Sequence, residues 1–94
     1  MRREYADPEL RALILDWLIR RGKWGASYSP LDTLTNNLSN VVKNDGRRIK
    51  KAVDDLVKRG FLNLHKKGDT VSLNPRLNRE ILEFVKKIMA CKRG

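Results

Sequence analysis

Apolar residues recur at the spacing of an α-helix near both ends of the chain. The first stripe follows Asp7 and Pro8, which suit a helix cap and a first helical position, and it precedes Gly22, which suits a helix end. These signals predict a helix over about residues 8–21 whose apolar side is formed by Leu10, Leu13, Ile14, Trp17 and Leu18. Asn74 and Pro75 precede a second stripe, which predicts a last helix over about 75–91 lined by Leu77, Ile81, Phe84, Val85 and Ile88.

Two further helices are predicted between these. Ser29, Pro30 and Asp32 form a start signal of the capping-box type, and the helix that follows buries Leu31, Leu34 and Leu38. This helix either stops at 39–40 or continues to Lys43. The next helix is predicted from about Asp45 to Arg59, with a buried side formed by Ile49, Val53, Leu56 and Val57. Gly60 is in position to end it in a left-handed conformation.

After Gly60 the apolar period changes from helical to alternating. Leu62 and Leu64 predict one strand, Val71 and Leu73 predict another, and all of these side chains are expected to face the helices. The loop between the strands contains Gly68, which tolerates positive φ in a hairpin. The predicted fold is therefore mainly α with a small antiparallel β-hairpin, in the order helix, helix, turn, helix, hairpin, helix. Residues 1–94 are expected to form a single domain with a core motif at about 29–73.

Charge indicates the kind of partner. Lys and Arg number 21 against 11 Asp and Glu, a formal net charge of +10, and a surface this basic repels itself unless it meets a polyanion. Nucleic acid is the commonest such partner and an anionic membrane surface is the second. The alternative to both is a basic but inert surface. No apolar run reaches the length of a membrane span, and the polar N-terminus does not read as a signal peptide. With Cys91 as its single cysteine, the chain is expected in a reducing compartment, the cytoplasm, associated with the nucleoid.

The sequence contains few of the residue combinations that catalysis requires. The single histidine, His65, is expected to face outward from the hairpin and lies far along the chain from Cys91. One Cys and one His cannot fill a zinc site, and no glycine-rich phosphate loop precedes a helix. We therefore expect no enzyme activity, no metal or other cofactor, and no small-molecule ligand.

The stretch from Ser29 to Leu73 resembles the winged helix-turn-helix superfamily of DNA-binding domains, of the kind found in small prokaryotic and archaeal transcription regulators. The resemblance is carried by a helix that ends in glycine and passes at once into an apolar strand and a basic loop, with Ile49, Val53, Leu56, Val57 and the run Gly60-Phe61-Leu62. The interval from Leu38 to Ile49 is longer than the short turn usual in that superfamily.

The resemblance implies a set of contacts with duplex DNA. The helix at 45–59 would lie in the major groove with Arg47, Arg48, Lys50 and Lys51 toward the bases. Lys66 and Lys67 would form a basic wing tip on the backbone or minor groove, and Ser29 and Thr33 would meet a phosphate at the start of the preceding helix. Lys43 completes the expected DNA-binding residues.

Other interpretations compete with this one. The cations at 47–51 can be a solvated face paired at i,i+4 spacing with Asp54 and Asp55. The same fold can also serve as a protein–protein interaction module or bind a structured RNA. Trp24 and Tyr28 can stack on a base, although docking of their connector against the core is the expected role.

The terminal helices carry more apolar surface than one core stripe needs. Leu15 and Ile19 lie off the stripe of the first helix, and Leu82 and Met89 widen the arc of the last helix to roughly 160°, against about 100° for a typical surface helix. This excess predicts a two-fold homodimer through these residues. The alternative is a thicker monomer core.

Overall fold

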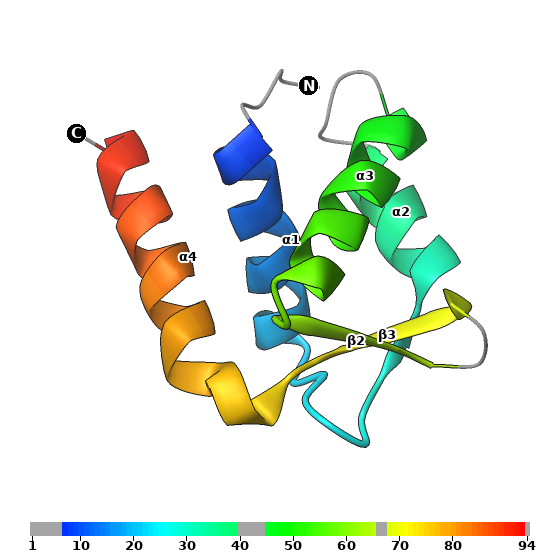
Figure 1. The fold of residues 1–94 in the computed structure, drawn as a ribbon. Helices are drawn as coiled ribbons and strands as arrows, with labels where there is room; N and C mark the ends of the chain where they lie inside the picture. Colours follow the sequence, from blue (N-terminus) through cyan, green and yellow to red (C-terminus); the bar gives the residue numbers. More distant parts are fainter. Residues whose placement is uncertain (1–6, 40–44, 66–67, 94) are drawn as a thin grey trace.

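The computed structural model describes residues 7–39, 45–65 and 68–93 and shows a mainly helical fold with a small antiparallel sheet. The elements run α1 (Asp7–Arg20), β1 (Ser29–Pro30), α2 (Leu31–Ser39), α3 (Asp45–Lys58), β2 (Leu62–His65), β3 (Thr70–Leu73), η2 (Pro75–Leu77, a 3-10 helix) and α4 (Asn78–Arg93). Helix α1 lies between α4 on one side and α3 on the other, and the sheet closes one end of this helical layer (Figure 1). The predicted order of helices and hairpin is confirmed.

Two glycines end helices as the sequence predicts. Gly22 has φ 66° and Gly60 has φ 83°, values that L side chains rarely adopt. After α1, the amide of Lys23 donates to the carbonyl of Leu18 at 3.1 Å. After α3, the amide of Phe61 donates to the carbonyl of Leu56 at 3.0 Å. Each glycine amide also donates to the carbonyl three residues before it, so both helix ends have the Schellman pattern.

The sheet has one strand more than the sequence predicts. Its order is β1-β3-β2, and β2 pairs with β3 in the expected antiparallel hairpin, with Leu62 opposite Leu73. Ser29 and Pro30, which we expected to cap and begin a helix, instead pair with β3 as β1. Proline is tolerated there because β1 is an edge strand. Helix α2 therefore begins at Leu31, whose amide donates to the carbonyl of Asp69 at 2.8 Å.

The connector after α1 lies beside β3 and completes the burial of this strand. Trp24 forms an isolated bridge with Leu73, and the amides of Gly25 and Leu73 donate to the carbonyls of Leu73 and Lys23 respectively. Every residue of β3 is buried because neighbours lie on both of its sides. The expected docking of Trp24 against the core is confirmed, since its side chain is half-buried against the hydrophobic cluster.

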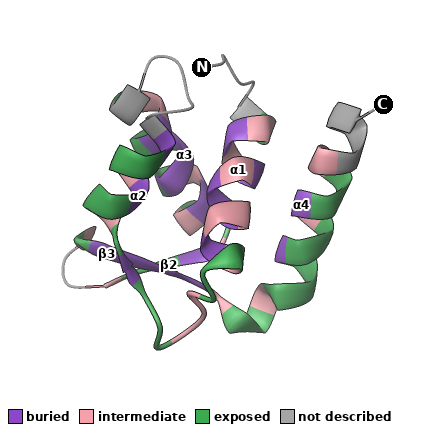
Figure 2. Cartoon of the chain, turned by 180° about the vertical axis from the view of Figure 1, so that it is seen from behind, coloured by how far each residue is buried: buried purple, intermediate pink, exposed green. Residues whose placement is uncertain are grey.

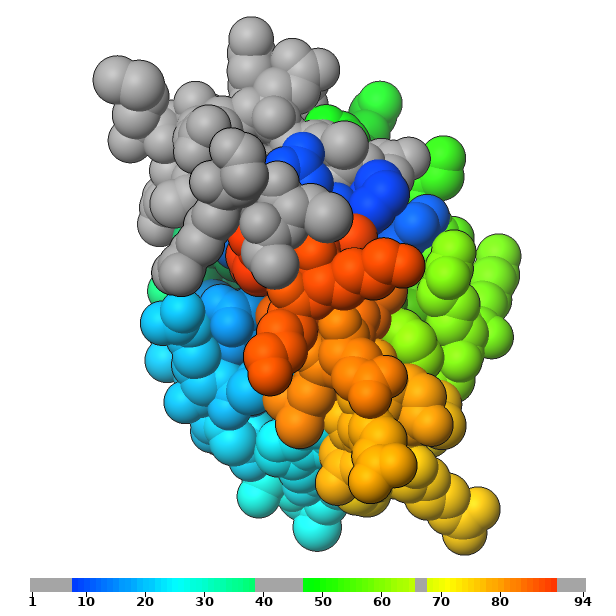
Figure 3. Space-filling view, turned by 90° about the vertical axis from the view of Figure 1, so that its left-hand side faces the viewer, coloured from blue at the N-terminus to red at the C-terminus, as the bar shows by residue number. Residues whose placement is uncertain are grey.

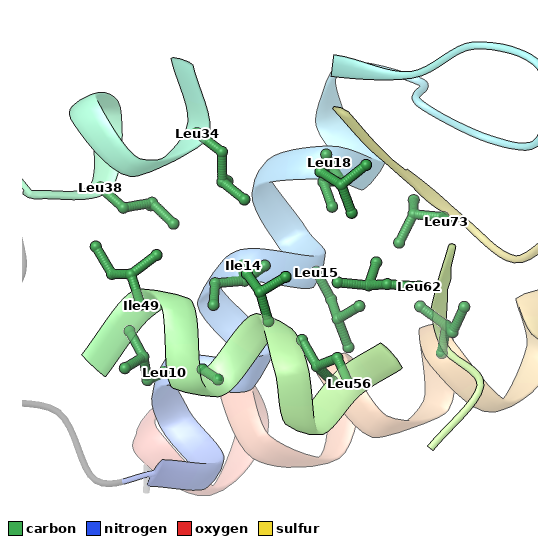
Figure 4. Packing of buried hydrophobic residues seen from close by; sticks show 14 of the residues in the cluster. Leu10, Ile14, Leu15, Leu18, Leu34, Leu38, Ile49, Leu56, Leu62 and Leu73 are labelled. Carbon is green, nitrogen blue, oxygen red and sulfur yellow. The ribbon is translucent and has the colours of Figure 1, made fainter. Parts of the chain in front are cut away.

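One core joins the helices and the sheet. The side chains that meet in its centre are fully buried and come from α1, α2, α3 and both hairpin strands; they include Leu10, Ile14, Leu15, Leu18, Leu34, Ile49, Leu56, Leu62 and Leu73 (Figure 4). Leu64 does not join them, contrary to the alternation of its strand, because it is 39% exposed and lies farther out along the hairpin than Leu62. Leu64 therefore lies on the predicted side of its strand but is not covered there by the helices.

The last helix begins one turn later than expected. Asn74 caps the 3-10 helix η2, its side-chain oxygen accepting from the amide of Arg76 at 3.1 Å, and α4 follows from Asn78. The side-chain nitrogen of Asn74 also donates to the carbonyl of Gly60 at 2.8 Å. This residue thereby ties the end of the hairpin to the end of α3. Within the described residues, no helix is long and apolar enough to cross a membrane.

Candidate nucleic-acid interface

Helix α3 has one apolar side and one charged side. Ile49, Ala52, Val53 and Leu56 are buried against α1 and α2. The exposed residues of the described part of α3 are all charged: Arg47, Lys50, Lys51, Asp54 and Lys58. Four of these five side chains are cations, and three of the four lie in the half of the helix that precedes Ala52. The exposed side of the first half of α3 therefore carries a concentrated positive charge.

Within the described residues, Asp54 and Asp55 form no ion pair with these cations. Asp55 forms an ion pair with Arg11 of α1, with 3.0 Å between Oδ2 and Nη2. Among the described residues, neither Lys50 with Asp54 nor Lys51 with Asp55 forms the ion pair that i,i+4 spacing suggests. The interpretation of this face as a set of internal salt bridges is wrong for these pairs, because α1 competes for one of the two carboxylates.

A small hollow lies between α1 and α3 at this ion pair. It has a volume of about 110 Å³ and is lined by Arg11, Arg48, Lys51, Ala52 and Asp55. The lining holds three cationic side chains and one carboxylate. Arg48 and Lys51 are among the DNA contacts predicted from the sequence, but Arg11 is not, because spacing along one helix carries no information about which residue of another helix crosses it.

The start of α2 fits a phosphate contact less well than the sequence predicts. Ser29 is only 3% exposed, and its hydroxyl donates to the carbonyl of Pro30 at 3.5 Å, so this side chain has little surface left for the predicted phosphate contact. Thr33 is exposed in the first turn of α2. The carboxylates of Asp32 and Asp69 are exposed at the same junction between α2 and the hairpin, which lowers its attraction for an anion.

Three of the predicted DNA-binding residues lie outside the described residues. Lys43 belongs to the segment 40–44, and Lys66 and Lys67 belong to the tip of the hairpin. The strands on either side of the tip are described and are paired from Leu62 with Leu73 to His65 with Thr70. The contacts predicted for these lysines stay predictions.

His65 contacts two neighbouring side chains. Its ring stacks on Tyr28 with 4.9 Å between the ring centroids, and its Nε2 lies 2.9 Å from the hydroxyl of Ser72. The side chain is half-buried by these contacts, although alternation with the buried Leu62 still places it on the side of the hairpin away from the core. The alternating pattern missed this contact because it arises from the connector that precedes β1. Among the described residues, no three His, Cys, Asp or Glu side chains come together in a group that could hold a metal ion.

The four residues predicted for a dimer interface do not share one surface. Leu15 is fully buried in the core, where α1 is covered by both α3 and α4, so its assignment to an interface is wrong. Ile19 and Met89 are half-buried and pack against the same core. Leu82 is 47% exposed on α4, the helix that lies outermost over α1 in Figure 3. Figure 2 shows that the buried positions of α4 face α1 and that its other sides are exposed.

Searches of protein-family models, of curated proteins and of solved structures found no match to this chain. Its function is therefore inferred from its own residues and their arrangement.

Proposed function

We propose that this chain is a nucleic-acid-binding domain of the winged-helix type that binds duplex DNA, as a transcriptional regulator or a chromatin-associated protein. In this proposal α3 lies in the major groove and the β2–β3 hairpin is the wing. Arg47 and Lys51 point toward the bases, Lys50 and Arg48 flank them, and the hairpin tip follows the backbone.

The observation that carries the proposal is the charged side of α3. Arg47, Lys50 and Lys51 are exposed on a helix whose opposite side is anchored in the core. Within the described residues, neither Asp54 nor Asp55 forms an ion pair with them. An exposed α-helix fits the width of the major groove. Cations without an ion-pair partner gain the most electrostatic attraction from a polyanion. The formal net charge of +10 adds a long-range attraction of the same sign.

A protein-binding module has less support. Such a module needs a contiguous apolar patch, and the exposed large apolar side chains among the described residues are Tyr28, Leu64 and Leu82. Leu64 is on β2 and Leu82 is on α4, and neither lies on α3. A protein partner would meet charged groups on the exposed side of α3 but no apolar surface.

A titration with three nucleic acids tests the proposal. Labelled duplex DNA, single-stranded DNA and duplex RNA of equal length are titrated at two salt concentrations while fluorescence anisotropy is recorded. We expect the tightest binding to duplex DNA and a steep loss of affinity with salt. Tighter binding to duplex RNA would favour the RNA alternative, and absence of binding to all three at low salt would refute the proposal.

A further inference from the structure

The hollow between α1 and α3 combines features of an oxyanion site. Arg11, Arg48 and Lys51 line it, together with a single carboxylate, Asp55, so its charged side chains sum to +2. Arg11 and Asp55 hold each other in place at 3.0 Å, and their side chains are only 17% and 31% exposed. A cation that is already fixed loses little conformational entropy when it receives a ligand. The hollow has room for several water molecules, and therefore for an ion with a few oxygens.

Arg11 has donor capacity that Asp55 does not use. The guanidinium has five N–H donors, and the ion pair with Asp55 is made through Nη2. Its Nε is buried and has no acceptor among the described residues. Because Nε is closed to solvent, an oxyanion beside Arg11 would accept from the Nη donors that Asp55 does not use, and phosphate geometry suits the planar fork of arginine.

We propose that this hollow binds one backbone phosphate of the nucleic acid, on the α1 side of α3. The inference rests on the proposed function, because it takes α3 to lie in the groove. A helix in the major groove is flanked by phosphates, and contacts to them fix the register of the protein without reading sequence. Lys51 belongs both to the exposed side of α3 and to the hollow, so a phosphate there would lie directly beside the bases that Arg47 is proposed to read. Arg11 then becomes the residue that locks the angle of α3.

The chain contains a matched control for each member of the ion pair. Arg20 and Asp16 form a second α1 ion pair at 2.8 Å, outside the hollow. Arg11→Gln and Arg20→Gln each remove one cation from α1, and Asp55→Asn and Asp16→Asn each remove one carboxylate from such a pair. Differences within each matched set therefore report on the hollow and not on net charge.

The test is duplex DNA affinity of the full chain and of the four variants by anisotropy, with melting curves for each. We expect Arg11→Gln to weaken binding about tenfold relative to Arg20→Gln, as for the loss of a charge-assisted hydrogen bond. The slope of log affinity against log salt should fall in magnitude by about 0.9, as for one lost phosphate contact. Asp55→Asn should tighten binding more than Asp16→Asn because it removes the one carboxylate from the hollow. If Arg11→Gln unfolds before binding can be measured, Asp55→Asn tests whether the hollow binds phosphate.

A titration with inorganic phosphate, followed by amide NMR shifts of the full chain, separates the two claims. Saturable shifts around Arg11 and Lys51, with the variant effects above, support the inference. If the chain binds duplex DNA but the variants within each set behave alike, the inference fails and the proposed function stands. If phosphate binds in the hollow and no nucleic acid binds to the chain, the proposed function fails, and with it the assignment of the hollow to a backbone phosphate.

Discussion

Arg47 is the described residue of α3 best suited to a base contact. It is exposed in the first half of the helix, and its planar fork can donate two hydrogen bonds to the acceptors of one guanine. We expect Arg47→Ala to cost about 1–3 kcal/mol of binding free energy on a preferred duplex and less on random DNA. Anisotropy titrations against a selected and a random duplex measure both values.

Lys86→Ala is the control for this prediction, since Lys86 is an exposed cation on α4. It should change the two affinities equally and only slightly. Melting curves of both variants should match that of the parent because both side chains are exposed. An equal loss on selected and random DNA in Arg47→Ala would show that Arg47 contacts phosphate instead of a base.

Alanine substitutions of Leu15 and Leu82 test the packing of the core. Leu15 is fully buried, so Leu15→Ala should lower the free energy of unfolding by about 2–5 kcal/mol through lost burial and a cavity. Leu82→Ala is the matched control, with an expected change within about 0.5 kcal/mol because Leu82 is exposed. Urea unfolding of both variants checks this, and similar losses would contradict the described packing of α1 against α3 and α4.

Residue-level burial is where the sequence predicts least. Helical periodicity identifies the centre of an apolar stripe, but it cannot show how many helices cover α1. Leu15 is buried because a second helix packs against α1. Alternation assigned Leu64 correctly to the side of the strand that Leu62 occupies, but it cannot show where the covering helices end. The pair of Arg11 with Asp55 depends on the crossing of α1 and α3, which no local spacing records.

At the scale of elements, the most predictable features are those with a strict backbone requirement. Gly22 and Gly60 end α1 and α3 because each adopts a positive φ that other residues resist. Strand β1 was missed because two residues have no periodicity, and because Ser29-Pro30 has the composition of a helix start. The connection between α2 and α3 includes residues 40–44, outside the described part of the chain, so the length of that turn stays a prediction.

Asn74 is the expected weak point in the connection between the hairpin and α4. It caps η2 through the amide of Arg76 and donates to the carbonyl of Gly60, so Asn74→Ala removes two hydrogen bonds at a junction of elements. We expect a loss of about 1–2 kcal/mol in the free energy of unfolding. Asn37→Ala is the control, because the side chain of Asn37 is exposed and donates only within α2, to the carbonyl of Thr33. Equal losses in the two variants would refute the junction role.

At the scale of the whole molecule, assembly is the first open prediction. With Leu15 in the core, the predicted two-fold dimer now rests mainly on Leu82 and the exposed sides of α4. A dimer predicts a mass of twice 10.9 kDa by light scattering at high protein concentration, and a return to 10.9 kDa in Leu82→Glu. A parent chain that stays at 10.9 kDa would refute the dimer without affecting the binding proposal.

In the proposed function, binding depends on where the cations lie and not only on how many there are. Two triple variants test it at equal charge: Arg47→Ala/Lys50→Ala/Lys51→Ala on α3, and Arg79→Ala/Lys86→Ala/Lys87→Ala on α4. All of these side chains are exposed, and each variant lowers the net charge of +10 by three. The measurement is duplex DNA affinity as a function of salt for the parent and both variants. We predict that the α3 variant loses about 100-fold or more in affinity, with a smaller salt slope, while the α4 variant stays within a few-fold of the parent. Equal losses in the two variants would contradict the account, because binding would then follow net charge alone.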